Sequence, residues 1–166
     1  SNWIGNGCII PAGPLREKMH AIKNFDIVFL NGPNKENENI KTKIFEINSN
    51  IKIFEGRYKV KNSEKLDKTQ NYLAFSGIGN PENFYITLQE INLNISKYLT
   101  FPDHYNYKKL ELDNIKKYAN KNNLKIITTE KDYLRLNTNF AQVIKYLKLD
   151  LVIPNEQKLI NILIKR

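Results

Sequence analysis

A glycine-rich turn between an apolar run and an amphipathic segment constrains the fold of this chain more than any other stretch. Residues 75–84 read Phe-Ser-Gly-Ile-Gly-Asn-Pro-Glu-Asn-Phe. Pro81 suits the first position of a helix, where its missing N–H would be unpaired anyway, and Asn80 before it suits the N-cap. Apolar residues then recur at spacings of four and three, at Phe84, Leu88 and Ile91. The stretch predicts a buried strand, a turn and a helix that packs back on the strand.

The same turn has two interpretations. The free amides and positive dipole at the start of a helix can receive an anion. A turn of Gly, Asn and Pro more often serves only to reverse the chain. The dinucleotide fingerprint needs a small residue where this chain has Glu82, and the 166 residues contain no Gly-x-x-x-x-Gly-Lys-Ser/Thr phosphate loop. The turn alone therefore assigns no phosphate site.

A regular alternation of strand and helix patterns begins at Tyr72. Strands are expected near residues 72–75, 95–99, 124–128 and 147–153. Helices are expected near residues 81–91, 108–122, 130–136 and 155–165. This order implies right-handed crossovers and an α/β fold with a small parallel sheet flanked by helices. Thr129 as N-cap and Asp132 three residues later resemble a capping box, which favours a structural role for this pair.

The residues before Tyr72 predict a strand and a hairpin. Residues 26–30 form a compact apolar run that ends in an Asn-Gly-Pro turn, which indicates a buried parallel strand. Residues 40–47 and 51–60 alternate apolar and polar residues around an Asn-Ser-Asn turn, which predicts an antiparallel hairpin with one wet face. The polar, lysine-rich residues 62–71 then mark a boundary between two lobes.

Near the N-terminus, a proline follows a glycine turn. Pro14 would start a helix and place Arg16 and Glu17 in its first turn. Glu17 suits the positive end of the helix dipole, and Arg16 offers a planar, bidentate donor fork. The simpler interpretation is a surface helix with an ion pair.

The charge of the chain is compatible with several classes of function and does not select one of them. A formal net charge of +9 comes from lysines scattered along the sequence. Such lysines usually form a solvated face, but they also suit nucleic acid, nucleotide phosphates or an anionic membrane. The single Cys8 and two histidines exclude a disulfide framework and a Cys/His zinc site, and fit a reducing cytoplasmic setting. No apolar run is long enough to cross a membrane, so membrane contact is expected to be peripheral.

Asp103 and His104 are the candidates for chemistry, because they follow an expected strand at the sheet edge where open α/β proteins bind ligands. His104 suits a general base, or a group that orients a carboxylate on another lobe. A lone loop histidine is more often structural. Ser76 and His104 would make a nucleophile and base, but the sequence has no nucleophile elbow and no third group.

Taken together, the motifs resemble the C-terminal half or more of tetraacyldisaccharide 4′-kinase, the lipid A 4′-kinase of Gram-negative bacteria. The matching runs, in chain order, are Gly5-Asn6-Gly7 with residues 11–17, residues 26–28 with Asn31-Gly32, residues 75–81 with Phe84, residues 101–104, and residues 129–132. Each run is weak by itself. Their common order and spacing over nearly the whole chain carry the resemblance.

The resemblance implies a two-lobed enzyme with an N-terminal P-loop kinase domain. Residues 1–33 would be the tail of that domain, 40–60 a two-stranded linker hairpin, 72–153 a small α/β lobe and 154–166 a terminal docking helix. The implied reaction transfers the γ-phosphoryl group of ATP, with Mg²⁺, to the 4′-hydroxyl of a tetraacyldisaccharide 1-phosphate. The implied location is the cytoplasmic face of the inner membrane, with an acylated disaccharide lipid as partner and no nucleic acid. The alternative is a basic nucleotide- or RNA-binding module without catalysis.

The resemblance also implies roles for individual residues. His104 matches the family's histidine that pairs with a carboxylate of the N-terminal portion, and Asp103 is the second catalytic candidate. Asn6, Arg16 and Glu17 match residues that line the cleft, so they are expected to bind substrate. The phosphate loop and the metal-binding acidic pair belong to the family's N-terminal portion. No metal or ATP site is therefore expected in these 166 residues, and the chain alone is expected to be inactive.

Overall fold

The computed structural model describes residues 4–31, 37–136 and 138–164. The chain forms two compact units, which are described separately. The central unit comprises residues 59–150, and the terminal unit combines the residues up to Tyr58 with those from Leu151 onward. The chain passes between the units twice, within strands β2 (Lys52–Val60) and β7 (Leu149–Val152).

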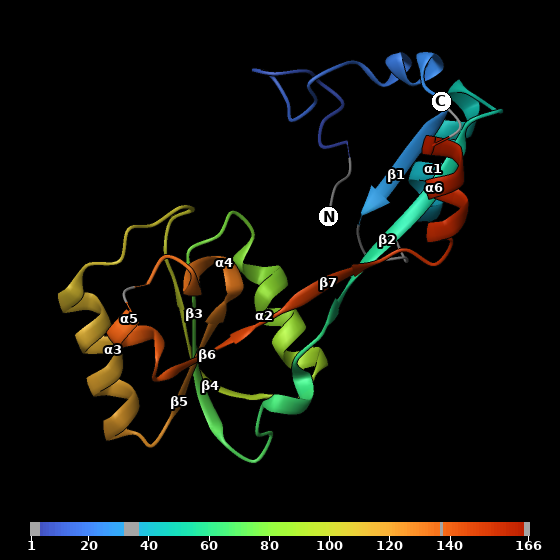
Figure 1. Cartoon of the computed structure of the whole chain (residues 1–166). Coiled ribbons are helices and arrows are strands. Elements are labelled where there is room, and N and C mark those ends of the chain that lie inside the picture. The colour runs from blue at the N-terminus through green and yellow to red at the C-terminus, as the bar shows by residue number, and fades with distance from the viewer. Residues whose placement is uncertain (1–3, 32–36, 137, 165–166) are drawn as a thin grey trace. The chain divides into compact units, whose positions relative to one another are not determined.

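A four-stranded sheet organises the central unit (Figure 1). Its strands are β3 (Asn71–Ser76), β4 (Asn94–Thr100), β5 (Lys125–Thr129) and β6 (Ile144–Leu147). They lie in the order β4-β3-β5-β6, and every pair is parallel. Residues 72–76 of β3 are all buried, because both faces of the sheet are covered. The predicted α/β fold with a small parallel sheet is confirmed.

Helices cover the two faces of this sheet. They are α2 (Pro81–Glu90), α3 (Lys109–Lys121), α4 (Glu130–Tyr133) and α5 (Thr138–Ala141), and a short 3-10 turn covers Ser63–Lys65. Successive residues of β3 point to opposite faces, so Tyr72 and Ala74 pack with Phe84 and Leu88 of α2. Leu73 and Phe75 pack instead with a second group, Leu112, Ile115, Ala119, Ile126, Phe140 and Ile144. Figure 1 shows α2 on one side of the sheet and α3 with α5 on the other.

The two predicted helix starts have the expected caps. The Asn80 side chain accepts a hydrogen bond from the Asn83 amide at 3.2 Å, and Pro81 is the first residue of α2. The Thr129 hydroxyl accepts one from the Asp132 amide at 3.0 Å. Local sequence therefore determines where these helices begin.

The terminal unit is built on β1 (Ile27–Asn31), which pairs in parallel with β2. Its described helices are a 3-10 helix (Met19–Asn24), α1 (Asn37–Ile47) and α6 (Glu156–Ile164). Leu30, Ile40, Ile44 and Ile51 form its core. Leu159 and Leu163 of α6 line a cavity of about 340 Å³ with Ile27 and Phe29 of β1. The predicted turn at Gly32-Pro33 lies outside the described residues.

The predicted hairpin over residues 40–60 is wrong. Residues 40–47 belong to helix α1, because Ile40 and Ile44 also have helical spacing and both are buried against the β1–β2 pair. The antiparallel partner of β2 is β7, which lies next to it in the sheet order β1-β2-β7. The Lys61 amide accordingly bonds to the Lys148 carbonyl at 2.9 Å.

Two further elements differ from those predicted, and the terminal helix is present. The chain bends at Arg16 and Glu17, and the helix expected from Pro14 is a 3-10 helix that starts at Met19. The strand expected over residues 147–153 is two strands, β6 and β7, which join different sheets. The helix expected in residues 154–166 is α6, which groups with the terminal unit and has no fully buried residue.

An ion pair between α1 and β2 predicts acid sensitivity in the terminal unit. The hydrogen bond from Lys41 to Glu55, at 2.9 Å, is the main cause of a lowered pKa for the Glu55 carboxyl. A lowered pKa in the folded state means that this pair stabilises the fold above the usual range of glutamate, and that the stabilisation is lost as pH falls through the folded value. We expect Glu55→Gln to lower the free energy of unfolding at about pH 7 and to change it much less at about pH 3. Urea unfolding at both pH values measures this, with the exposed Glu46→Gln as control. An equal loss at both pH values would contradict it.

Candidate functional site

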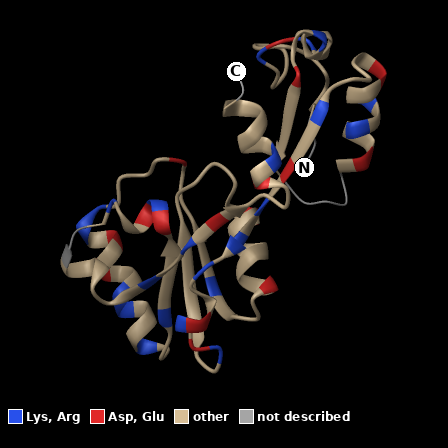
Figure 2. Ribbon diagram, turned by 45° about the vertical axis from the view of Figure 1, so that its right-hand side comes forward, with Lys and Arg blue, Asp and Glu red and all other residues tan. Residues whose placement is uncertain are grey.

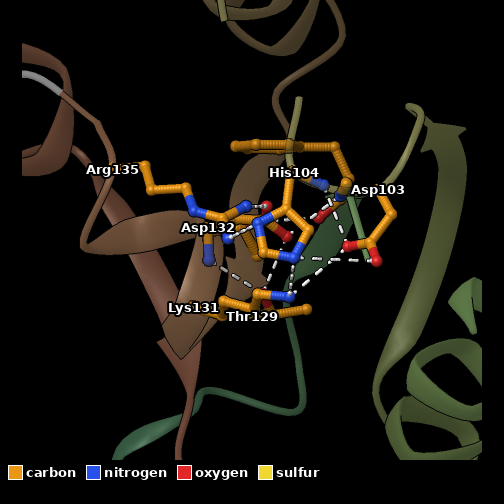
Figure 3. Close-up of polar contacts among 9 residues, drawn as sticks. Asp103, His104, Thr129, Lys131, Asp132 and Arg135 are labelled. Carbon is orange, nitrogen blue, oxygen red and sulfur yellow. Dashed lines mark hydrogen bonds and ion pairs between the residues drawn. The ribbon is translucent and has the colours of Figure 1, made fainter. Parts of the chain in front are cut away.

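The candidate site lies where three parallel strands of the central unit end at the same edge of the sheet. β3 runs into the Gly77 turn, β4 into the loop that carries Asp103 and His104, and β5 directly into α4. Ligands of open α/β sheets bind at this edge. Figure 3 shows the side chains of Asp103, His104, Lys131 and Arg135 gathered there.

The backbone of His104 is tied to the turn after β3. Its amide donates to the Asp103 carboxylate at 2.9 Å and to the Gly77 carbonyl at 3.2 Å. Its φ is +60°, a left-handed conformation that is uncommon for a residue with a side chain. The side chain itself is 70% exposed. The loop therefore fixes the backbone and presents the imidazole to solvent.

Two basic side chains and one carboxylate surround the imidazole ring. Arg135 Nη2 lies 2.9 Å from Nδ1, and Lys131 Nζ lies 3.4 Å from Nε2. Asp103 Oδ2 is 3.9 Å from Nε2. Sequence reasoning found His104 and Asp103 but missed Lys131 and Arg135. Lys131 and Arg135 follow β5 and are four residues apart, which places them on one side of a helical turn. That spacing was the signal available in the sequence.

Asp103 is held in its ionised form. Desolvation by itself would raise the pKa of this carboxyl, but the hydrogen bond and charge of Lys131, together with His104, lower the pKa below its ordinary value. Asp103 Oδ1 lies 3.4 Å from Lys131 Nζ. The pair sets one negative and one positive charge beside the ring.

Asp132 lies beneath this group and is fully buried. Its Oδ2 accepts from the Gly77 amide at 3.0 Å and from the Thr129 hydroxyl at 2.7 Å. Its Oδ1 lies 3.8 Å from Arg135 Nη1. Asp132 is thus more than the predicted cap, because it joins the turn after β3 to the helix after β5.

Aromatic rings pack under the loop. Phe101 and Tyr107 meet edge to face at 5.1 Å between centroids, and Phe75 meets Tyr107 at 5.3 Å. Burial is the main cause of a raised pKa for the Tyr107 hydroxyl. A methyl group on Gly77 would come within 2.8 Å of that hydroxyl oxygen, so the turn needs glycine for close packing.

Ser76 is not the partner of His104. Its hydroxyl is buried and lies 2.8 Å from the hydroxyl of Tyr98, which bonds to the Pro81 carbonyl at 2.6 Å. Since Tyr98 gives its proton to Pro81, Ser76 donates to Tyr98. This network fixes the start of α2 to the sheet.

The predicted substrate-binding residues Asn6, Arg16 and Glu17 lie in the terminal unit and are exposed. The Asn6 side chain donates to the Ala12 carbonyl at 2.8 Å and accepts from the Cys8 amide at 3.1 Å. Asn6 therefore shapes its own loop. Arg16 and Glu17 follow that loop at a bend.

The part of the chain that the structure describes contains neither a cluster of metal ligands nor a helix that could cross a membrane. Within residues 4–31, 37–136 and 138–164, His, Cys, Asp and Glu side chains form no group of three or more that could hold a metal ion. No helix in the same ranges has the length and apolar composition needed to cross a bilayer. Basic and acidic residues are interspersed in both units (Figure 2).

Comparison with known proteins gives one consistent family. The family model of tetraacyldisaccharide-1-P 4′-kinase matches residues 1–166. The tetraacyldisaccharide 4′-kinase of Pelagibacter ubique is 48% identical over 164 residues, which are 99% of this chain and 52% of that protein. That of Rickettsia bellii is 40% identical over 164 residues, which are 98% of this chain and 49% of that protein. The chain thus spans about half the length of these curated relatives.

A solved structure shares the fold. It is the "apo" form of LpxK from Aquifex aeolicus in complex with ATP, with a TM-score of 0.64 and 22% sequence identity, and the match covers 96% of this chain and 48% of that one. At this identity the likeness concerns the fold alone. Since the family model matches the chain along its whole length, the chain belongs to the tetraacyldisaccharide-1-P 4′-kinase family.

Proposed function

We propose that this chain forms part of a kinase that transfers the γ-phosphoryl group of ATP to the 4′-hydroxyl of a tetraacyldisaccharide 1-phosphate. The observation that carries the proposal is how His104 is held. Its backbone is hydrogen-bonded at the ligand-binding edge of a parallel sheet, while its side chain is 70% exposed. A histidine that serves only to pack the core would have a buried ring. A held, exposed imidazole suits a hydrogen bond to a group that arrives from outside the central unit, such as a carboxylate that it orients.

The central unit contributes positioning and charge to this reaction. Phosphoryl transfer depends mainly on the alignment of the reactants and on neutralisation of charge. His104 would pair with a carboxylate of the rest of the enzyme and assist removal of the proton from the sugar hydroxyl. Asp103 is paired with Lys131, so it would hold Lys131 and the ring in place. Asp103 thus supports catalysis through its neighbours.

The terminal unit would contribute to substrate binding. Asn6, Arg16 and Glu17 are exposed, and Arg16 is suited to a phosphate group or sugar hydroxyls. ATP and Mg²⁺ would be held by residues outside this chain. The acylated substrate would be met at the cytoplasmic face of the inner membrane, in a peripheral contact. By itself, the chain would therefore transfer no phosphoryl group.

Replacement of half of a related enzyme tests this function. In the chimera, this chain replaces the 164 matching residues of the Pelagibacter ubique kinase. We expect the chimera to support growth of a bacterium whose own 4′-kinase has been switched off, whereas the 166-residue chain alone does not. Failure of a folded chimera, combined with tight and salt-sensitive RNA binding by the chain, would instead support a basic binding module.

A further inference from the structure

A line of polar contacts runs from the buried carboxylate of Asp132 through Arg135 to the ring of His104 (Figure 3). We propose that Arg135, oriented by Asp132, is a positioning residue that fixes the His104 imidazole in the tautomer with its proton on Nε2. The catalytic consequence rests on the proposed function. The contacts themselves lie entirely within the central unit.

Asp132 is a rigid anchor for Arg135. Its Oδ2 is occupied by the Gly77 amide and the Thr129 hydroxyl. Its Oδ1 makes no hydrogen bond to the described residues, and Arg135 Nη1 is the cation that faces it, at 3.8 Å. One arm of the guanidinium is therefore drawn toward a buried negative charge. The planar fork then aims its other arm, Nη2, at the imidazole.

The Arg135 contact decides which ring nitrogen of His104 carries the proton. A guanidinium donates hydrogen bonds and never accepts them. At 2.9 Å from Arg135 Nη2, the Nδ1 atom of His104 must be the acceptor. The neutral ring therefore carries its proton on Nε2.

The Nε2–H group has no good acceptor among the side chains around it. Lys131 Nζ, at 3.4 Å, is a donor only, so it cannot bond to a protonated Nε2. Asp103 Oδ2, at 3.9 Å, is beyond hydrogen-bond distance. The donor is thus held ready for an acceptor that comes from outside, such as a carboxylate of the rest of the kinase. A hydrogen bond from Nε2–H would orient that carboxylate as the base for the sugar hydroxyl, while the imidazole itself stays neutral.

The tautomer is measurable by ¹⁵N NMR of the histidine rings in the 166-residue chain, above the pH range in which histidine titrates. We expect His104 to show one tautomer, with Nδ1 unprotonated and accepting a hydrogen bond. We expect Arg135→Met, which keeps the apolar stem and removes the donors, to reduce the tautomer ratio by about tenfold, as fits a hydrogen bond from a charged donor. His20, exposed on the 3-10 helix, is the control in the same spectra and should not change.

The chimera described above supplies the catalytic readout. We expect Arg135→Met to lower kcat about tenfold while KM stays within about twofold, and Arg135→Lys to restore part of kcat because an ammonium keeps one donor. A proton on Nδ1 in the unaltered chain, or a tautomer ratio that Arg135→Met leaves unchanged, overturns the proposal. So does a chimera that needs His104 but not Arg135. If His104→Ala left turnover intact, the catalytic role of His104 in the proposed function would fail, while the tautomer assignment would stand.

Discussion

His104→Ala in the chimeric kinase is expected to lower turnover by about 10² to 10⁴, the usual range for a group that takes part in general acid–base catalysis. The loss should appear in kcat, since an interaction made mainly in the transition state affects kcat more than KM. The central unit should stay folded, because the imidazole is 70% exposed and contributes little to the core. Steady-state kinetics with ATP and the disaccharide measure the effect, and circular dichroism checks the fold.

His20→Ala is the matched control for this substitution. His20 is an exposed histidine of the terminal unit, so the same chemical change should leave turnover within about twofold. If both variants kept full turnover, His104 would be structural and the site assignment wrong. A change in KM alone would assign His104 to substrate binding.

Asp132→Ala is expected to lower the stability of the central unit by roughly 3 to 5 kcal/mol, as for loss of one partner from a buried charged network. The carboxylate is fully buried, and its removal leaves the Gly77 amide and the Thr129 hydroxyl without their acceptor. The start of α4 also loses part of its support. Urea unfolding followed through backbone NMR signals of the central unit measures this loss.

A second Asp132 variant separates the charge of the carboxylate from its hydrogen bonds, and a substitution on α3 serves as the control. Asp132→Asn keeps an acceptor oxygen but removes the charge, so it should cost about 1 to 2 kcal/mol, less than the alanine variant. Asp113→Ala makes the same truncation on α3, where the side chain is partly exposed, and should stay within about 0.5 kcal/mol. A loss of the same small size for Asp132→Ala and Asp113→Ala would contradict the network.

Local sequence signals predicted the central unit well. Asn80 with Pro81 and Thr129 with Asp132 mark helix starts through bonds within four residues, and these bonds are present. The continuous apolar run of β3 predicted a strand buried on both faces. In each case the information lies within one element, so neighbouring elements could not change the outcome.

Pairing between distant segments could not be predicted from the same signals. Residues 40–47 satisfy both strand and helix periods, and burial of Ile40 and Ile44 against β1 and β2 decides for the helix. Residues 144–152 divide between two sheets because β6 pairs with β5 while β7 lies beside β2. The division depends on tertiary contacts, which the local sequence pattern does not specify.

Only part of the candidate site was predicted, because the site combines residues from segments that are distant in the sequence. Asp103 and His104 lie in one loop, and their place after an expected strand identified them before the family resemblance gave them roles. Arg135 comes from another strand end and meets the ring only when β4 and β5 are brought to one edge by β3. The four-residue spacing of Lys131 and Arg135 was a signal for one face of a helical turn, but the same spacing also occurs on solvated helices.

The most direct test of the proposed kinase is to follow the labelled γ-phosphoryl group of ATP in the purified chimera with tetraacyldisaccharide 1-phosphate. The account predicts a bisphosphorylated product with the label on the 4′-oxygen, formed by the chimera and lost with His104→Ala. It predicts no labelled product from the 166-residue chain alone. A folded chimera that binds ATP but transfers nothing, or that labels another position, would contradict the account.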